Sequence, residues 1–552
     1  MIKARLRRLR PRDVRRLWTD RETQKLWATY FAGKVIGIGA VFGAMTALTW
    51  YFDSAAGAAT RQDVPLANTV ATSVSAINTT WVLVTAFLVF FMQAGFMALE
   101  AGFARSRESV YVLLECVFDT CLCGILYWAI GFAFQFGYGN GFIGHTFFFL
   151  HGMTPTYMFS STADTGVAFL AFWLFQFAFA DTASTVTSGA MVGRTSFKGD
   201  IIYSLAVSGF IYPIFAHWAW GPGGWLGNSM GWFAGFVNND GGIVFRDFAG
   251  STVVHTVGGF IALMGAIVLG PRLGRKFKRD GGGPLPPHDL VMATIGATIL
   301  WFGWYGFNPG STLSAMDFVG IGRVAANTTL AACAGGMAAV LFVYPRAKKW
   351  DLGMSLNGFL GGLVAITCPC YWVSPAGAIW IGAIAGIIVP LGVDLLEYLR
   401  IDDPIGAVAV HGFAGIWGTL SLGLFATGQY GLPGASGAGP AATIDGKDVF
   451  VTGLFHGGGW DQLKAQFVGS MTCVVVVSLA SYIVFRIIKM LPGSWNLRLE
   501  RDGELEGMDI FEHGTPAYHV EFGQGMTYTT LVTGGTPFSG SSVKVPESSS
   551  TS

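Results

Sequence analysis

Twelve apolar runs, most of them about twenty residues long, constrain this chain most strongly, because a run of that length can cross a lipid bilayer as one helix. Charged residues make up only 12% of the 552 residues, half of the roughly 25% that is usual in soluble domains. The sequence therefore predicts an all-α, polytopic membrane protein. The predicted spans are 34–52, 77–103, 110–136, 165–190, 200–220, 248–271, 289–306, 321–345, 353–371, 376–397, 405–426 and 464–488.

The charge of the connecting loops indicates the orientation. Alternate loops are basic, whereas the loops between them (138–164, 221–246 and 428–463) contain only Arg246 and Lys447. By the positive-inside rule, the basic loops and the tail from about 489 lie in the cytoplasm. We predict a multi-pass protein of the cell's inner (plasma) membrane. The basic loops carry Arg105 and Arg107; Arg194 and Lys198; Arg272, Arg275, Lys276, Lys278 and Arg279; Arg346, Lys348 and Lys349; and Arg400.

The two ends of the chain differ from its centre. Residues 1–33 form a basic segment that we expect to be cytoplasmic, and 34–58 is either a retained membrane anchor or a signal segment. The membrane domain, 77–488, then has eleven spans. We expect 489–518 to be a cytoplasmic regulatory tail, and the Ser-, Gly- and Thr-rich residues 519–552 to be disordered.

Two of the nine histidines lie well inside apolar runs. His255 follows Asp247 by eight residues in Asp247-Phe-Ala-Gly-Ser-Thr-Val-Val-His255, and His411 follows Asp403 by eight in Asp403-Pro-Ile-Gly-Ala-Val-Ala-Val-His411. An ionisable group at membrane depth costs at least about 2.5–3.5 kcal/mol, which makes it a candidate functional residue. The two histidines lie on oppositely directed spans, five apart in the eleven-span domain. This pattern favours an inverted repeat of five plus five helices with one extra, and a site at the repeat interface.

Three motifs resemble the Amt/Mep/Rh ammonium transporter family, most closely its bacterial Amt branch. They are Asp247 to His255, Gly303-Trp-Tyr-Gly-Phe-Asn-Pro-Gly-Ser311, and Asp402-Asp-Pro followed by Val410-His411-Gly, within a resemblance from about Asn78 to Tyr518. The resemblance implies the eleven-helix ammonium transporter fold, a homotrimer with one pore in each subunit, and ammonium or ammonia as substrate, with methylammonium as a further candidate.

The resemblance also implies roles for individual residues. Trp220, Ser311 and Phe179 would recruit ammonium at the outer face, where an indole ring supplies cation–π attraction of about 0.5–2 kcal/mol. Phe179 and Phe307 would form a gate, and His255 and His411 would line the pore. We interpret Asp247 as a structural and electrostatic residue, and Thr367 as a residue of the outer vestibule. The expected function is recruitment of NH4+, its deprotonation and conduction of NH3 past the histidines, with net charge movement.

Several alternatives stay open at this point. An Rh-like neutral NH3 channel and an ammonium sensor with little flux are the nearest ones, and a membrane enzyme that uses the histidines as metal ligands is more distant. We predict no enzyme activity, no catalytic residue, no metal site and no cofactor; Cys368-Pro-Cys370 lacks further ligands and is a poor metal site. We expect lipid contact and no nucleic-acid partner. The tail motif from Glu504 to Tyr518 suggests a PII-family signal protein as a candidate cytoplasmic partner.

Three acidic residues inside predicted spans depart from the resemblance. Asp181 lies two residues after Phe179, and Glu115 and Asp119 are four residues apart, which places them on one helix face. We favour a structural role for these carboxyl groups over an added proton or cation route.

Overall fold

A computed structural model describes residues 70–160, 163–238, 242–433, 439–444 and 446–518. Within them, ten helical stretches are long and apolar enough to cross a membrane, and a shorter apolar helix, α14, accompanies them. These eleven stretches confirm the predicted spans from 77–103 onward. The predicted run 34–52, the basic segment 1–33 and residues 519–552 lie outside the described residues.

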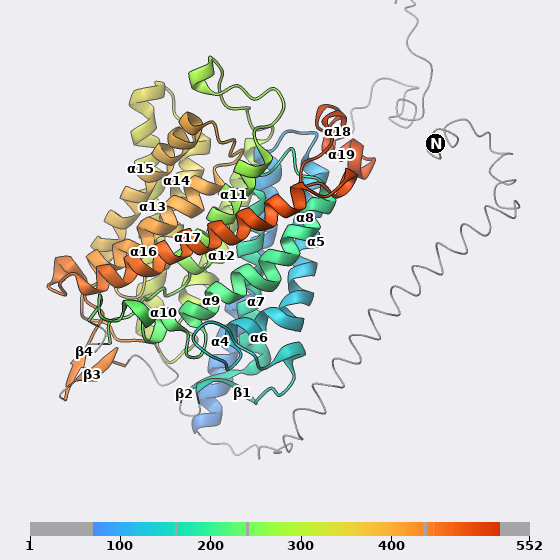
Figure 1. Cartoon of the computed structure of the whole chain (residues 1–552). Coiled ribbons are helices and arrows are strands. Elements are labelled where there is room, and N and C mark those ends of the chain that lie inside the picture. The colour runs from blue at the N-terminus through green and yellow to red at the C-terminus, as the bar shows by residue number, and fades with distance from the viewer. Residues whose placement is uncertain (1–69, 161–162, 239–241, 434–438, 445, 519–552) are drawn as a thin grey trace, which may run out of the picture.

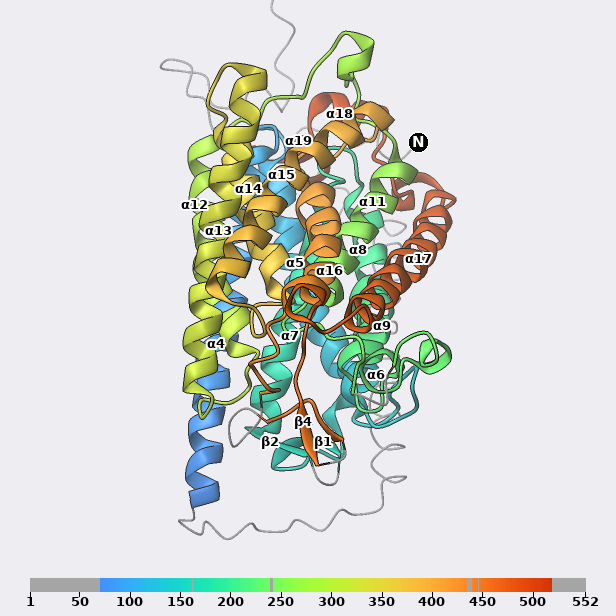
Figure 2. The same ribbon diagram turned by 90° about the vertical axis from the view of Figure 1, so that its left-hand side faces the viewer.

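Most of the spans are continuous α-helices. They stand side by side as a bundle, with α17 crossing its surface obliquely (Figures 1 and 2). The continuous spans are α4 (Val70–Phe103), α7 (Phe169–Ser188), α12 (Leu290–Gly310), α13 (Phe318–Ala347), α14 (Leu352–Thr367), α15 (Pro375–Leu399) and α17 (Asp461–Lys489).

Four spans contain a π-helical turn, in which the hydrogen bonds reach one residue further than in an α-helix. Two of these turns, η6 and η8, carry the two membrane histidines. The four spans are α5 (Ser109–Leu126), η1 (Tyr127–Gly131) and α6 (Phe132–Phe136); α8 (Phe197–Ala206), η3 (Val207–Ile211) and α9 (Tyr212–Trp220); η6 (Ser251–Thr256) and α11 (Val257–Leu269); and η8 (Val408–Phe413) and α16 (Ala414–Phe425).

Polar side chains define where several helices begin. A backbone N–H in the first turn has no partner within the helix, and a Ser or Asp just before the helix can accept its hydrogen bond. Five helices start in this way. The pairs are Ser196 with the N–H of Gly199, Asp289 with Met292, Asp317 with Gly320, Asp351 with Met354, and Ser374 with Gly377.

The two ends of the bundle carry different structures (Figure 1). One end, the hairpin face, bears two antiparallel strand pairs, β1 (Thr156–Ser160) with β2 (Ala163–Ala168) and β3 (Ala442–Ile444) with β4 (Lys447–Val449). It also bears the short helix α10 (Trp225–Asn228). The opposite end, the tail face, bears α18 (Arg501–Glu506) and α19 (Met508–His513) together with the basic loops.

Several predicted boundaries differ from the structure by a few residues, and α4 begins seven residues before the predicted start at 77; in two places the predicted span extends beyond its helix. The span predicted at 165–190 starts as the end of strand β2, and its helix begins only at Phe169. The span predicted at 353–371 leaves the helix after Thr367, and Cys368–Tyr371 form turns. In both places apolar residues continue past the helix end because they remain buried in the fold, so hydropathy alone does not mark the boundary.

Candidate functional site

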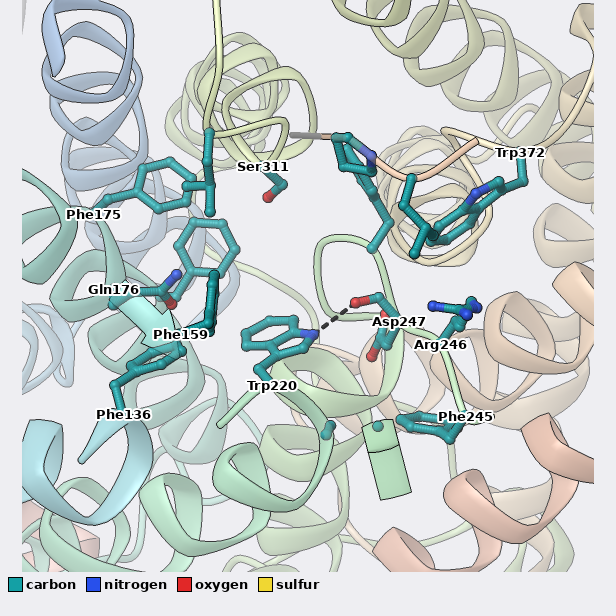
Figure 3. Close-up of a pocket in the computed structure, with 17 residues that line it drawn as sticks. Phe136, Phe159, Phe175, Gln176, Trp220, Phe245, Arg246, Asp247, Ser311 and Trp372 are labelled. Carbon is teal, nitrogen blue, oxygen red and sulfur yellow. Dashed lines mark hydrogen bonds between the residues drawn. The ribbon is translucent and has the colours of Figure 1, made fainter. Parts of the chain in front are cut away.

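A cavity of about 310 Å³ opens on the hairpin face, and it gathers the three residues predicted to recruit the substrate. Phe179 of α7, Trp220 at the end of α9, and Ser311 just after α12 all line it. Figure 3 shows the Trp220 indole and the Ser311 hydroxyl on different sides of this cavity. The structure therefore brings the three candidate recruitment residues into one space.

Local hydrogen bonds hold two of these side chains in place. The Trp220 indole N–H donates to the backbone oxygen of Asp247 at 2.7 Å, which fixes the ring plane (Figure 3). Ser311 Oγ donates its proton to the backbone oxygen of Phe307 at 2.8 Å. Because a hydroxyl has one proton and two lone pairs, Ser311 can then act toward the cavity only as an acceptor. An aromatic face and an acceptor together suit a cation that donates hydrogen bonds.

Two phenylalanine rings close the floor of the cavity. The Phe179 and Phe307 ring centroids are 4.0 Å apart with an interplanar angle of 20°. Phe179 also meets the Trp220 ring edge-on at 6.1 Å. Both phenylalanines are buried. This apolar stack lies between the cavity and the residues beneath it.

Beneath the stack the two histidines contact each other. His255 Nδ1 and His411 Nδ1 are 3.2 Å apart, so one of these nitrogens donates the proton and the other accepts it. The His255 ring stacks on Phe307, with centroids 5.4 Å apart, and on Trp304 at 5.1 Å. Both imidazoles are buried. A continuous series of ring contacts thus leads from Trp220 to His411.

An aspartate opens each histidine segment. The Asp247 carboxylate accepts hydrogen bonds from the backbone N–H groups of Gly250, Ser251, Thr252 and Val253 at the start of η6. Burial raises the pKa of this carboxyl, and the four N–H donors oppose that change. Asp247, interpreted from the sequence as a structural and electrostatic residue, thus caps the start of η6.

Asp403 occupies the equivalent place before η8. Its carboxylate accepts from the N–H groups of Ala407 and Val408. Burial raises the pKa of Asp403 to about 6, and these same N–H groups limit the rise. Each histidine therefore follows an aspartate by eight residues and lies on a π-helical turn.

Glycines let the two histidine segments approach closely. A Cβ at Gly259 would collide with the backbone nitrogen of Gly412, directly after His411. Small residues at helix contacts allow backbones to pack closely in membranes. The glycines that follow both histidines in the sequence therefore set the separation of η8 and α11, and with it the contact between the imidazoles.

The space beyond the histidines continues toward the tail face. A cavity of about 20 Å³, lined by His411 and Glu100, lies next to them. A larger one of about 550 Å³ follows, lined by Arg272, Arg275 and Asp402 among others. Asn357 lines both cavities. The described residues thus place the histidines between a cavity on the hairpin face and two on the tail side.

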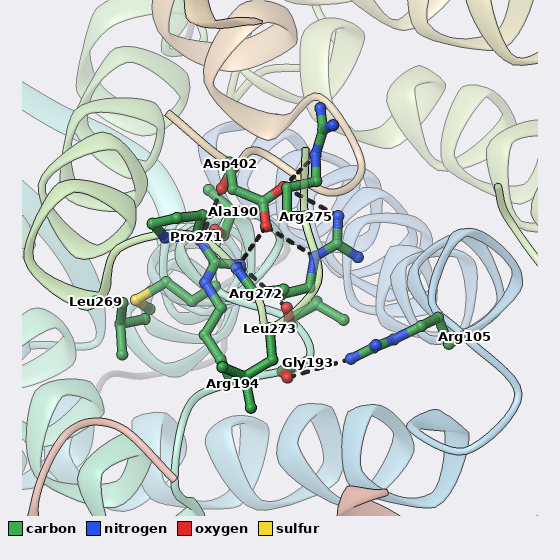
Figure 4. A network of polar contacts seen from close by, with 12 residues as sticks. Arg105, Ala190, Gly193, Arg194, Leu269, Pro271, Arg272, Leu273, Arg275 and Asp402 are labelled. Carbon is green, nitrogen blue, oxygen red and sulfur yellow. Dashed lines mark hydrogen bonds and ion pairs between the residues drawn. The ribbon is translucent and has the colours of Figure 1, made fainter. Parts of the chain in front are cut away.

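An ion-pair network surrounds the cavity on the tail face (Figure 4). Arg272 binds Asp402 through its backbone N–H, its Nε and its Nη2, at 2.9, 2.9 and 3.0 Å. Arg194 donates to the backbone oxygen of Asp402 at 2.7 Å. Although burial opposes it, Arg272 and Arg194 hold the pKa of Asp402 well below its usual range. The end of α11 is thereby joined to the start of η8.

Four more residues that the sequence reasoning singled out take the following positions. Thr367 is buried rather than on the cavity wall, and its hydroxyl accepts the Trp304 indole N–H at 2.9 Å. Asp181 is buried, and neither of its carboxylate oxygens has a hydrogen-bond partner among the described residues. Glu115 and Asp119 lie on one face of α5, as predicted, and converge with Asp200 of α8.

Sequence reasoning missed three residues of the site. Trp304 stacks on His255, Glu100 lies in the small cavity beside His411, and Arg246 lines the outer cavity next to Asp247. Trp304 and Arg246 stand within or beside motifs that were recognised. Glu100 had a detectable signal, because an acidic residue inside an apolar run is itself a candidate functional residue.

Neither histidine belongs to a group of three or more His, Cys, Asp or Glu ligands in the part of the chain that the structure describes. A metal centre at the paired imidazoles would need further ligands at the same depth. The geometry thus gives no support to the metal-enzyme alternative.

Known proteins are similar to this chain in sequence and in fold. The model of the Ammonium Transporter Family matches residues 80–518. The chain is 41% identical to ammonium transporter Amt2 of Archaeoglobus fulgidus, over 80% of this chain and 88% of that protein. It is 39% identical to a putative ammonium transporter of Synechocystis, over 83% and 94%.

Solved structures agree with this relationship. A protein described as a sensor Amt protein superimposes with a TM-score of 0.68 at 33% identity, over 79% of this chain and 98% of that one. Mep2 of Candida albicans gives 0.65 at 26% identity, over 77% and 87%. The described fold is therefore that of the polytopic, all-α Amt/Mep proteins, and the chain belongs to the ammonium transporter family.

Proposed function

We propose that this protein recruits NH4+ in the cavity on the hairpin face, removes its proton, and conducts NH3 past His255 and His411 with net movement of charge. The observation that carries the proposal is the 3.2 Å contact between the two Nδ1 atoms, reached from the cavity through stacked rings. The protein would be a transporter and not an enzyme, with no cofactor.

The cavity suits the first step. Ammonium is close in size to potassium, so charge alone does not select it, but ammonium donates hydrogen bonds and a metal ion does not. The Trp220 ring attracts a cation by about 0.5–2 kcal/mol, and Ser311 can accept a hydrogen bond. Asp247, beside the indole, adds negative potential. Phe179 would serve both as a wall of this recruitment site and as a gate residue.

The floor of the cavity suits the second step. The stack of Phe179 and Phe307 is apolar, so a hydrated cation has to lose water to enter it, and neutral ammonia crosses more readily. Two imidazoles that share one proton can pass a proton between them, because each nitrogen can change from donor to acceptor. This arrangement offers the proton a route separate from that of ammonia.

We also place the protein in the inner (plasma) membrane as a homotrimer, with the tail face in the cytoplasm. The basic residues of the tail face support this orientation by the positive-inside rule. Methylammonium is a candidate second substrate. A PII-family signal protein is a candidate partner at the tail face, beside α18 and α19.

Current across a solid-supported membrane after an ammonium jump tests the proposal. Reconstituted wild-type protein should give a saturable current that His255→Ala/His411→Ala reduces to the level of empty liposomes. His217→Ala is the matched control, since His217 is also buried but contacts the backbone oxygens of Gln135 and Asn140 outside the ring series. An unchanged current in the double variant would contradict the histidine route.

The same experiment separates the alternatives. Absence of current, with ammonia flux still visible as a change of internal pH, would make the protein a neutral channel of the Rh kind. Absence of both signals, with ammonium binding retained, would make it a sensor. One solved structure of similar fold is described as a sensor Amt protein, which is why this outcome is measured directly.

A further inference from the structure

Three buried carboxyl groups meet near the tail face, away from the paired histidines. Glu115 and Asp119 lie one turn apart on α5, and Asp200 lies in the first turn of α8. One oxygen of each carboxyl group is within 4.8 Å of the other two. All three side chains are at most 2% exposed. Three acidic groups from two helices therefore converge on a single point.

The charges of this cluster are not compensated by the protein that surrounds it. Among the described residues, no Lys or Arg forms an ion pair with any of the three groups. Asp119 Oδ1 and both oxygens of Asp200 have no hydrogen-bond partner. Buried charges are normally paired or bound to a metal ion, because burial without a partner is costly. The cluster needs a positive occupant.

Hydroxyl groups complete the shell around the cluster. Tyr203 donates to Glu115 Oε1 at 2.9 Å. Ser204, which follows Asp200 by one turn on α8, is fully buried, and its hydroxyl lies beside the Asp119 carboxyl without forming a hydrogen bond of good geometry. An unsatisfied hydroxyl beside unsatisfied carboxylate oxygens is a further oxygen ligand in the correct place. This observation is independent of the acidic residues themselves.

We propose that Glu115, Asp119, Asp200 and Ser204 bind a hard divalent cation of the Mg²⁺, Mn²⁺ or Ca²⁺ class. Such ions take oxygen ligands at about 2.0–2.6 Å, so ligand atoms on opposite sides of one ion are roughly 4–5 Å apart. The observed limit of 4.8 Å fits that separation. A divalent ion with one proton retained on the three carboxyl groups leaves the cluster without net charge.

The position of the cluster indicates where the ion would come from. Two backbone groups close to it bind the tail helix α19: Tyr111 N–H donates to Asp509 at 3.0 Å, and Phe197 N–H donates to Glu512 at 2.9 Å. Figure 1 shows α19 over the ends of α5 and α8. A bound ion would join α5 to α8 directly beneath the tail, and the compartment that contains the tail would supply it.

Manganese binding to the purified full-length protein tests this site. The protein is stripped with EDTA and titrated with Mn²⁺, and the free ion is followed by electron paramagnetic resonance, with Ca²⁺ and Mg²⁺ as competitors. Wild-type protein should bind Mn²⁺ stoichiometrically. Asp200→Asn should lower the affinity by more than the roughly 10–100-fold that loss of an outer-shell partner costs, and Ser204→Ala should lower it less.

Asp181→Asn is the matched control, since Asp181 is an equally buried carboxyl group outside the cluster. It should bind Mn²⁺ like the wild type, and Mn²⁺ should raise the melting temperature of both but not that of Asp200→Asn. If Asp200→Asn fails to fold, Ser204→Ala decides the matter by its own loss of affinity. Equal binding by wild type and cluster variants, or no binding by the wild type, would overturn the proposal and leave protons as the occupants.

Discussion

Trp220 illustrates how one side chain can do two things at once. Its indole N–H donates a hydrogen bond to the backbone oxygen of Asp247, and its ring lines the cavity. The ring of Phe179 meets its edge. A cation that enters the cavity therefore meets an aromatic surface that is held in place before binding, which lowers the entropy lost when it binds.

Replacement of this indole should weaken recruitment more than conduction. We expect Trp220→Leu to raise the ammonium concentration for half-maximal current by about 2- to 30-fold, the range that corresponds to a cation–π attraction of about 0.5–2 kcal/mol. This half-maximal concentration is measured by recording the membrane current over a series of ammonium concentrations. Trp218→Leu is the control, because Trp218 lies on the same helix but does not line the cavity. Equal shifts in both variants would contradict a specific role for Trp220.

The sequence predicted the residues of this site, but it did not predict all of the contacts between them. Trp220, Ser311 and Phe179 lie up to 132 residues apart in the sequence, and the fold brings them to one cavity as the resemblance implied. The stack of Trp304 on His255 was not predicted. The Trp304 indole also donates a hydrogen bond to Thr367 of α14, and no local sequence pattern reports such side-chain contacts between distant helices.

At the scale of elements, the close packing of η8 on α11 determines how the imidazoles meet. We expect Gly259→Ala to push the two segments apart, since the new Cβ would strike the Gly412 backbone. Overpacking of this kind costs about 1–3 kcal/mol, and loss of the imidazole contact should reduce the ammonium current as well. Melting temperature and current, measured on the same preparation, test both effects.

The neighbouring glycine provides the control. A Cβ at Gly412 would meet the Phe260 ring at 3.6 Å and the backbone carbonyl carbon of Gly259 at 3.7 Å, which are both ordinary van der Waals distances. Gly412→Ala should therefore keep most of the stability and current of the wild type. If the two variants behaved alike, backbone separation would not be what positions the histidines.

Hydropathy predicted the helical spans but not their internal form. The predicted run 248–271 corresponds to η6 and α11, and the run 405–426 to η8 and α16. A window of apolar residues has the same hydropathy whether the chain winds as an α-helix or takes a π-helical turn, so the turns at His255 and His411 were not visible. The convergence of Asp200 with Glu115 and Asp119 was missed because it depends on how α8 packs against α5.

At the scale of the whole molecule, the tail face is held together by buried ion pairs. Asp402 binds Arg272 and lies 3.4 Å from Arg275. Tail residue Glu504 accepts from the Leu273 backbone and, at 2.8 Å, from Arg498. The loop after α11, the start of η8 and the tail therefore belong to one network.

Removal of one partner from this network should lower the stability of the folded protein. We expect Asp402→Asn to destabilise the protein by about 3–5 kcal/mol, because Arg272 would keep a buried charge without its partner. The pKa of Asp402 is depressed, so its contribution to stability is present above the ordinary pKa of an aspartate and is lost only as the pH falls through the lower folded value. The loss of stability caused by Asp402→Asn should therefore be constant between about pH 5 and pH 8.

Thermal unfolding across this pH range provides the measurement. Asp280→Asn is the control, because Asp280 pairs with Arg400 at an exposed position and solvent screens such pairs. It should leave the melting temperature nearly unchanged. A loss in Asp402→Asn that varied strongly between neutral and mildly acidic pH would contradict the low pKa assigned to Asp402.

Both halves of the molecule place an aspartate, a π-helical turn and a histidine in the same order, with eight residues from aspartate to histidine. A helix advances by about 100° per residue. Loss of a single residue between Asp247 and His255, or between Asp403 and His411, would restore ordinary winding and turn one imidazole away from the other. These two stretches should therefore accept changes of residue type far more readily than changes of length, because their length sets the direction in which each imidazole points.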